Sequence, residues 1–212
     1  MVNLEINNKE ILSKPNIKAD IIPGMSAGGY SLGMDFNNFL NKISKNFIHQ
    51  DKEIDLSLTT HNSWVIERFS NEYFLDYKFA YWNNIVILRF GNDNKLNFIK
   101  LKKGYRGKLF KKVGINDRLD ILIDDYYFLF YYDVHLLVDK IKNRKILDKY
   151  IFDNDLYDID ICNDFDIMSI IYNIDDIITV DGVEFNTNYL TQYSKEYSNQ
   201  IIEEIIVFSN QY

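Results

Sequence analysis

Hydrophobic and polar positions along this chain change their spacing several times, and each change predicts a different element. In MDFNNFLNKISKNF, residues 34–47, apolar side chains recur every three or four positions, at Phe36, Phe39, Leu40, Ile43 and Phe47. This spacing places them on one face of an amphipathic helix. Asp35 directly precedes the series and is suited to cap it. We therefore predict a helix that begins after Asp35.

From about residue 63 to 101 the apolar spacing shortens to two. The segments SWVIERF, EYFLDYKFAYW, NNIVILRF and KLNFIKL are rich in β-branched and aromatic residues, which favour strands. The run Gly91-Asn92-Asp93-Asn94 separates the last two segments and is typical of a hairpin loop. We predict an antiparallel meander here, with further strands in YYFLFYYDVHLLVD, DFDIMSIIYN and DDIITVDGVEF.

Two glycine-rich segments, PGMSAGGYSLGM (23–34) and KGYRGKLFKKVG (103–114), each precede a helical pattern. We match Gly104 with Gly24 and Gly114 with Gly33, and we take Asn116 as a candidate cap for a second helix. Glycine permits a positive φ or a close backbone contact. The sequence therefore predicts structural turns at Gly24, Gly28, Gly29, Gly33, Gly104, Gly107 and Gly114.

These patterns together predict an α+β fold, with antiparallel sheets and a few packed helices in a single domain over residues 1–212. The repeated glycine segments suggest an internal duplication into strand-turn-helix-meander halves, about residues 19–101 and 102–187. A final helix over residues 188–208 would bury a stripe formed by Leu190, Tyr193, Tyr197, Ile201, Ile205 and Phe208.

The first glycine segment also contains a G-x-S-x-G string centred on Ser26. A nucleophile elbow of this kind needs a strand before the serine and a helix immediately after it. Gly28 and Gly29 are poor helix starters, and the helical pattern begins only after Gly33. We therefore interpret the segment as a structural corner, and we predict no catalytic residue. A small hydrolase that uses Ser26 or a pair of carboxylates is the alternative.

No pattern of metal-ligating residues is present. The three histidines and the single cysteine lie far apart in the sequence, at His49, His61, His135 and Cys162. The segment FDNDLYDIDICNDFD lacks the glycine and the distal glutamate of an EF-hand loop. We predict no metal site and no cofactor.

Charge is unevenly distributed over the 212 residues, whose net charge is −7. Residues 100–112, KLKKGYRGKLFKK, are strongly basic, and we expect them to form ion pairs within the chain. No Lys or Arg occurs between Lys149 and Lys195, where aspartates alternate with tyrosines. Such a segment is either a solvated face or a surface that attracts a cationic partner. The predicted partner-binding residues are Asp153, Asp155, Tyr157, Asp158, Asp160, Asp164 and Asp166.

The acidic balance argues against direct nucleic-acid binding, which needs a concentrated positive surface. The first 20 residues lack the basic start and apolar run of a signal peptide, and no apolar run is long enough to span a bilayer. We therefore expect a cytoplasmic protein without a membrane partner.

The segments IIPGMSAGGYSLGMDFNNFLNKI and KGYRGKLFKKVGINDRLDIL, with IVILRFGNDNKLNFIKL and GVEF, carry a resemblance to a known class of proteins. The chain resembles the immunity proteins of bacterial polymorphic toxins, including those of contact-dependent inhibition and Rhs-type systems. The resemblance implies a non-enzymatic inhibitor that binds a cognate toxin domain, often a nuclease, and blocks its active site. A nuclease would be cationic because it binds a polyanion. A general protein-interaction domain is the remaining alternative.

Overall fold

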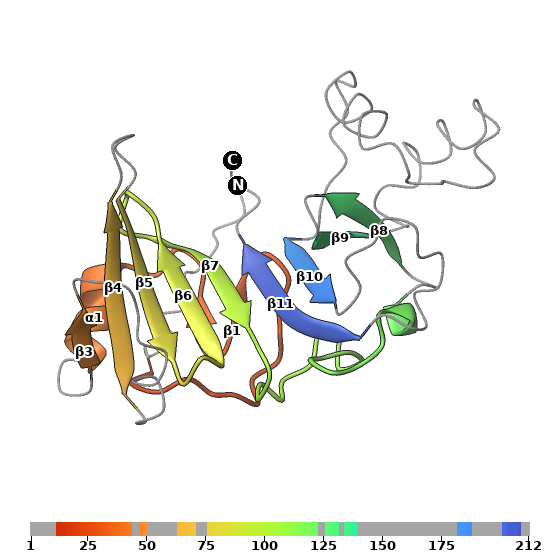
Figure 1. Cartoon of the computed structure of the whole chain (residues 1–212), viewed down its shortest axis with the longest axis horizontal. Helices are drawn as coiled ribbons and strands as arrows, with labels where there is room; N and C mark the ends of the chain where they lie inside the picture. The colour runs from red at the N-terminus through yellow and green to blue at the C-terminus, as the bar shows by residue number, and fades with distance from the viewer. Residues whose placement is uncertain are drawn as a thin grey trace, which may run out of the picture.

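The protein has an α+β fold built on one large, mostly antiparallel sheet (Figure 1). The computed structural model describes residues 12–43, 47–50, 63–70, 76–122, 126–131, 134–139, 182–187 and 201–208. Within these residues there are a nine-stranded sheet, a two-stranded sheet, one α-helix and one short 3-10 helix. In this described part, no helix is long and apolar enough to cross a membrane.

The strands of the large sheet follow the order β3-β4-β5-β6-β7-β11-β10-β9-β8. Only the pairing of β3 with β4 is parallel. The bounds of these strands are β3 Phe47–Gln50, β4 Trp64–Ser70, β5 Asp76–Trp82, β6 Val86–Phe90, β7 Leu96–Leu101, β8 Tyr126–Tyr131, β9 Val134–Asp139, β10 Val183–Thr187 and β11 Ile202–Phe208. The small sheet pairs β1 (Ser26–Ala27) with β2 (Tyr30–Ser31).

Strands β4 to β7 form the predicted antiparallel meander, which is confirmed. The three residues 83–85 join β5 to β6. Ile85 N–H donates to Trp82 O at 2.8 Å, and the central residues of this turn, Asn83 and Asn84, have φ values of 47° and 51°, as a type I′ turn requires. The predicted hairpin loop at Gly91–Asn94 is also confirmed, because Asn94 N–H donates to Gly91 O at 2.9 Å. Asparagine tolerates the left-handed region, and this property sets the register of both hairpins.

The predicted first helix is present as α1 (Phe36–Ile43), and Asp35 caps it. Asp35 Oδ1 accepts hydrogen bonds from the backbone N–H groups of Asn37 and Asn38, at 3.0 and 3.2 Å. These bonds lower the pKa of Asp35, with the Asn38 bond contributing most. The prediction was wrong at Phe47, which begins β3 and pairs with Trp64 instead of adding to the helical face.

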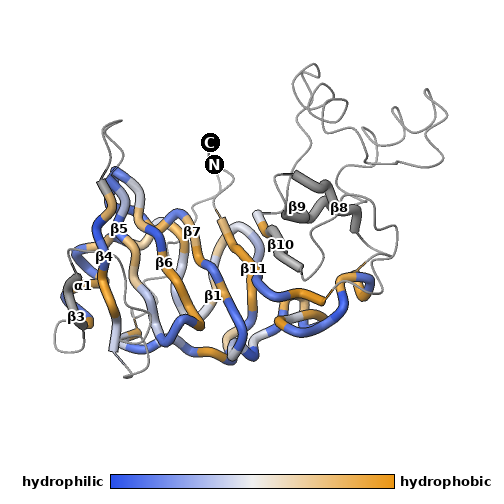
Figure 2. The backbone as a smooth tube through the Cα atoms, in the orientation of Figure 1, coloured by the Kyte–Doolittle hydropathy of each residue, from blue (hydrophilic) through white to orange (hydrophobic). Residues whose placement is uncertain are grey.

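One face of the meander packs against α1 and the N-terminal segment to form the core. Phe39 is fully buried, and its ring meets those of Trp64, Phe90 and Tyr30 at centroid distances of 5.1, 5.5 and 5.9 Å. Tyr30 donates its hydroxyl hydrogen to Leu12 O at 3.0 Å. We call this side of the sheet the core face. Figure 2 shows the long hydrophobic stretches of β6 and β11 that contribute to it.

The predicted C-terminal helix over residues 188–208 was wrong where the structure describes it, because Ile202–Phe208 is strand β11. Ile201, Ile205 and Phe208 fit a helical stripe, but Ile202, Ile206 and Val207 make the segment equally suited to a strand. Pairing decides the conformation, because β11 lies between β7 and β10 and bonds to both.

The second predicted helix is much shorter than the first. It is a single 3-10 turn, η2 (Leu119–Leu122), which buries Leu119 and Leu122. Asn116 has a φ of 67°, which a residue that caps a helix does not adopt. Asn116 N–H instead donates to Ile202 O at 2.8 Å, which ties this segment to β11.

Candidate partner-binding face

The side of the sheet opposite α1 carries a group of partly exposed aromatic side chains. Strand registers place Phe79, Arg89 and Phe98 in one row across β5, β6 and β7. The residues that alternate with them, such as Ala80, Leu88 and Ile99, point into the core face and are fully buried. We call the following residues the aromatic face: Phe69, Tyr77, Phe79, Tyr81, Arg89 and Phe98.

Two neighbouring rings of the aromatic face, Phe79 and Tyr81, are held by specific contacts. Phe79 stacks on Tyr81 at a centroid distance of 6.1 Å, and Tyr81 donates its hydroxyl hydrogen to Glu67 Oε2 at 3.1 Å. Burial, reinforced by the charge of Glu67, raises the pKa of Tyr81 well above its usual value, so the phenol stays protonated. Phe69 lies at the end of β4 and is 48% exposed. The face therefore combines fixed rings with accessible apolar surface.

Arg89 lies among these rings with its guanidinium fixed. Its guanidinium carbon is 4.5 Å from the ring centroid of Phe98 and 5.4 Å from that of Tyr77. Its Nε donates to Asn97 Oδ1 at 3.1 Å. Cation–π contacts of this kind restrict the side chain while its polar edge remains available.

Charges beside the aromatic face largely balance. Glu204 accepts ion pairs from Lys100 at 2.9 Å and from Lys102 at 3.0 Å. With Glu67, it offsets most of the positive charge of these lysines and Arg89. A polyanion needs several uncompensated cations along a track, so the face is better suited to a protein surface.

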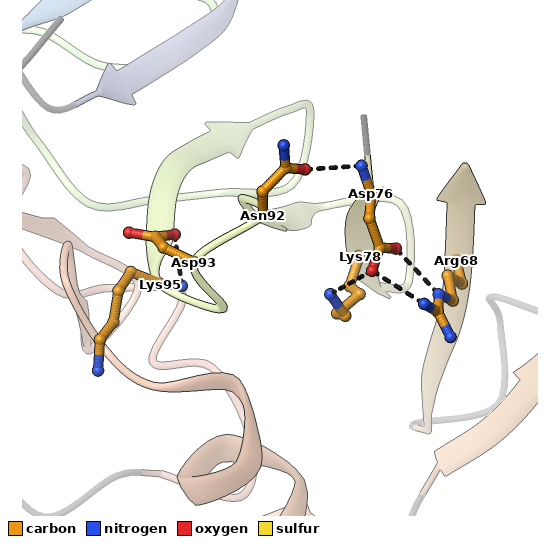
Figure 3. Close-up of polar contacts among 6 residues, drawn as sticks. All are labelled: Arg68, Asp76, Lys78, Asn92, Asp93 and Lys95. Atoms are coloured by element: carbon orange, nitrogen blue, oxygen red, sulfur yellow. Dashed lines mark hydrogen bonds and ion pairs between the residues drawn. The ribbon is translucent and has the colours of Figure 1, made fainter. Parts of the chain in front are cut away.

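A second arginine, Arg68, is held very differently at the far end of the core face (Figure 3). Its Nε and Nη2 donate to the two carboxylate oxygens of Asp76, each at 2.9 Å. Lys78 pairs with the same carboxylate at 3.2 Å, and Asn92 Oδ1 accepts from Asp76 N–H at 2.6 Å. The Arg68 hydrogen bond is the main reason that the pKa of Asp76 is lowered. The cluster reaches the core through Lys78, whose Nζ lies 5.9 Å from the ring centroid of Phe36.

Beside it, the β6–β7 loop is braced by Asp93 and Lys95. Asp93 Oδ1 accepts from Lys95 N–H at 3.0 Å (Figure 3), and Lys95 Nζ pairs with Asp35 at 3.4 Å. The loop is therefore tied to the N-terminus of α1. These contacts hold the meander and the helix together without involving the aromatic face.

Ser26 does not lie in a strand-to-helix elbow. It begins strand β1, which turns at once into β2, so that Ser26 pairs with Ser31. Its backbone N–H and C=O bond to Ile22, at 3.0 and 2.9 Å. The segment is thus a small hairpin rather than the element that presents a nucleophile.

The glycine segments do correspond, but not through the glycines that the sequence suggested. Ile22–Ser26 and Leu109–Val113 are the matching turns: Ile22 N–H donates to Ser26 O at 2.9 Å, and Leu109 N–H to Val113 O at 2.7 Å. Their starts lie side by side, because Ile21 bridges Leu109. The residue equivalent to Gly24 is therefore Lys111. Whether the two halves arose by duplication stays a prediction.

The two turns differ in backbone strain. Gly24 has a φ of 61°, and glycine adopts this value readily. Phe110 and Lys111 occupy the second turn with φ values of 52° and 59°, a conformation that bulky L-residues rarely adopt. Phe110 is also 37% exposed. Of the predicted turn glycines, those with a positive φ are Gly24, Gly28, Gly29, Gly33 and Gly104.

The remaining predicted turn glycines, Gly107 and Gly114, lie where another backbone passes closely. A Cβ atom on Gly107 would lie 1.8 Å from Ala19 O, and one on Gly114 would lie 2.9 Å from Gly107 O. Next to Gly107, Tyr105 donates to Ala19 O at 2.7 Å and accepts from Gly28 N–H at 2.9 Å. Burial raises the pKa of Tyr105 to about 12. Tyr105 thus joins the two glycine segments.

The basic segment forms the expected internal ion pairs where the structure describes it, through Lys100 and Lys102 to Glu204 and through Lys108 to Asp117. The predicted partner-binding residues of the acidic segment lie outside the described residues: Asp153, Asp155, Tyr157, Asp158, Asp160, Asp164 and Asp166. His61 and Cys162 do too, while His49 and His135 lie in strands β3 and β9.

Sequence reasoning missed the aromatic face, although a signal for it was present. In WVIERF and DYKFAYW, both sets of alternate positions contain large apolar or aromatic residues, whereas a strand with one solvated face alternates with polar residues. A search for known proteins found no matching family, no similar curated protein and no similar solved structure. The function is therefore inferred from the contacts and exposure of the described residues.

Proposed function

We propose that this protein is an immunity protein that binds a cognate antibacterial toxin domain and neutralises it by occlusion, without a chemical step. The aromatic face is the observation that supports a protein-binding role. Tyrosine and arginine are enriched among the residues that dominate binding energy at protein interfaces. Here Tyr77, Tyr81 and Arg89 lie together on one face with their side chains held by contacts.

Pre-organisation makes this face suitable for tight binding. Association is opposed by the ordering of side chains at the interface, by about 0.5–1.5 kcal/mol for each long side chain that becomes fixed. Ring stacking and the Glu67 hydrogen bond already restrict Phe79 and Tyr81 in the unbound protein. When a partner covers these side chains, little further side-chain entropy is lost. Most of the free energy gained by burying the rings would therefore contribute to binding.

The resemblance to immunity proteins supplies the partner class, a toxin domain that acts in the cytoplasm. The near balance of charge around the face favours an apolar contact. The acidic segment predicted from the sequence would attract a cationic nuclease. Its role stays a prediction, tested by changing Asp153, Asp155 and Asp158 to Lys and measuring the association rate at low salt.

The proposal predicts that the adjacent upstream gene encodes a large secreted protein whose variable C-terminal domain is the toxin, and the test uses that domain. Calorimetry gives the Kd of the complex, and survival of cells that express both proteins gives protection. We expect Phe69→Ala and Tyr77→Ala to weaken binding at least tenfold each, which is about 1.4 kcal/mol, and to lower protection.

Ile121→Ala is the matched control, because Ile121 is 43% exposed on η2, close to the 48% of Phe69. We expect it to leave the Kd within about twofold, as for most surface positions outside an interface. Equal effects of the control and the face variants would reject the aromatic face as the binding surface. Failure of the wild-type chain to bind or protect would reject the function itself.

A further inference from the structure

Arg68 and Arg89 belong to the same meander but differ in the groups that surround their guanidinium ions. Arg68 has a carboxylate partner within the chain, since Asp76 accepts from both its Nε and Nη2. Arg89 is fixed by rings and an amide instead, with Nε bonded to Asn97. Among the described residues, no acceptor contacts Nη1 or Nη2 of Arg89. Its outer edge therefore presents hydrogen-bond donors for which the described part of the chain supplies no acceptor.

The groups that fix Arg89 are themselves well positioned. Asn97 lies close to the backbone of Gly91, and a Cβ atom there would lie 2.8 Å from Asn97 Nδ2. The space beside Gly91 thus accommodates the Asn97 amide, whose Oδ1 receives Arg89 Nε. Across the strands, Phe79 and Phe98 are the direct neighbours of Arg89 in the sheet. The guanidinium is held in one plane before any ligand arrives.

A planar guanidinium with two available N–H groups on one edge matches a carboxylate in bidentate geometry. The aromatic surroundings lower the local exposure to water, which strengthens such a bond. Near the same face, Glu67 and Glu204 offset two of the three positive charges of Lys100, Lys102 and Arg89, which leaves about one positive charge for a ligand. These features favour a single negative charge carried beside an apolar group.

We propose that Arg89 is the recognition site for a carboxylate of the partner protein, an Asp or Glu side chain flanked by apolar residues. The proposal rests on the proposed function for the identity of the partner, but the chemistry of the site is independent of it. Phe98, Tyr77 and Asn97 act as positioning residues, and Arg89 makes the contact.

The first test measures the Kd for the toxin domain with Arg89→Gln and Arg89→Lys. We expect both variants to weaken binding at least tenfold, because lysine retains the charge but loses the planar fork and the ring contacts. Lys100→Gln is the matched control, since Lys100 carries a positive charge on the same side of the sheet that Glu204 already pairs. We expect it to change the Kd less than threefold. A Kd unchanged in both Arg89 variants would overturn the proposal and leave the proposed function intact.

The second test needs no toxin. The Nε–H signals of the arginines are followed by NMR while N-acetylphenylalanine is added, with N-acetylphenylalanine amide as the neutral match and dimethyl phosphate as the phosphate match. We expect a saturable shift of the Arg89 signal with the carboxylate alone, and none at Arg68. The same shift with the amide, no shift, or a shift with dimethyl phosphate alone would overturn the proposal. If the toxin domain does not bind the wild-type chain, this titration still decides the chemistry of Arg89.

Discussion

The two faces of the β4–β7 meander are made from alternate residues of the same strands, yet they differ in how their aromatic rings are used. On the core face, Phe39 and Trp64 are fully buried and meet edge to face. On the aromatic face, Phe79 and Tyr81 stack and remain partly exposed. The two arginines differ in the same way. On the core face Arg68 pairs with Asp76, and on the aromatic face Arg89 lies against the ring of Phe98. One face stabilises the fold, and the other keeps organised side chains accessible.

Successive side chains of a strand point to opposite faces of the sheet, so one strand can contribute both to the core and to an accessible surface. The core face gains stability from complete burial, which makes its residues sensitive to any loss of volume. The aromatic face gives less stability for each ring, because part of each ring still contacts water. Substitutions of the same type on the two faces should therefore separate stability from binding.

The largest expected contrast is between Phe39→Ala and Phe79→Ala. Phe39→Ala opens a cavity among Tyr30, Trp64 and Phe90, and we expect it to lower the free energy of unfolding by about 3–5 kcal/mol. Phe79→Ala removes a partly exposed ring that stacks on Tyr81 of the same strand, and it should cost about 1 kcal/mol. Urea denaturation measures both. A larger loss for Phe79→Ala would mean that the aromatic face is a second core.

A finer contrast comes from removing one hydroxyl on each face. Tyr30→Phe removes the donor to Leu12 O in the core, and we expect a loss of about 1–2 kcal/mol. Tyr81→Phe removes the partly exposed bond to Glu67, and we expect about 0.5 kcal/mol or less because water can replace the donor. Thermal unfolding of the two variants gives the comparison. Equal losses would contradict the assigned difference in burial.

The cap of α1 tests how firmly the helix covers the core face. Asp35→Ala removes the acceptor for the Asn37 and Asn38 N–H groups and should cost about 1 kcal/mol. Asp35→Asn serves as the control, because asparagine caps helices almost as well. Denaturation at neutral pH measures both variants. If both lose the same stability, the ion pair with Lys95 rather than the cap would be responsible.

The smallest expected effect is the acid dependence that Asp76 contributes. Its folded-state pKa lies below the ordinary value of 3.8, mainly because of the Arg68 hydrogen bond. Ionised Asp76 therefore stabilises the fold above pH 3.8, and this contribution is lost as the pH falls through the lowered pKa. In Asp76→Asn, stability should decline less steeply between pH 4 and pH 2, as urea midpoints would show. An unchanged slope would assign the acid dependence to other carboxylates.

The aromatic face shows why a site can be missed when only the sequence is examined. Tyr77, Phe79 and Tyr81 were visible as strand residues, but the pattern could not tell which of two apolar sets would be buried. Which set is buried depends on the side of the sheet that α1 covers. Arg89 is harder still, since its partners Phe98 and Asn97 come from the next strand and Tyr77 from the previous one. The acidic segment was visible from charge alone, and its role stays a prediction.

Local sequence determined the parts of this protein in which neighbouring residues suffice. Asp35 and the apolar spacing specified the start and inner face of α1, and asparagines with Gly91 specified the hairpins of the meander. These features follow from hydrogen bonds and backbone preferences within a few residues. The α+β class followed from them.

Only the tertiary structure decided the conformation of segments whose pattern suits two periods. Ile202–Phe208 became a strand because β7 and β10 supply backbone partners on both sides. Leu109–Val113 formed the same backbone hydrogen bonds as Ile22–Ser26, despite having Phe110 and Lys111 in place of Pro23 and Gly24, and Leu109 bridges Ile21. The gain from pairing and burial between distant segments exceeds the weak local preferences that a single sequence displays.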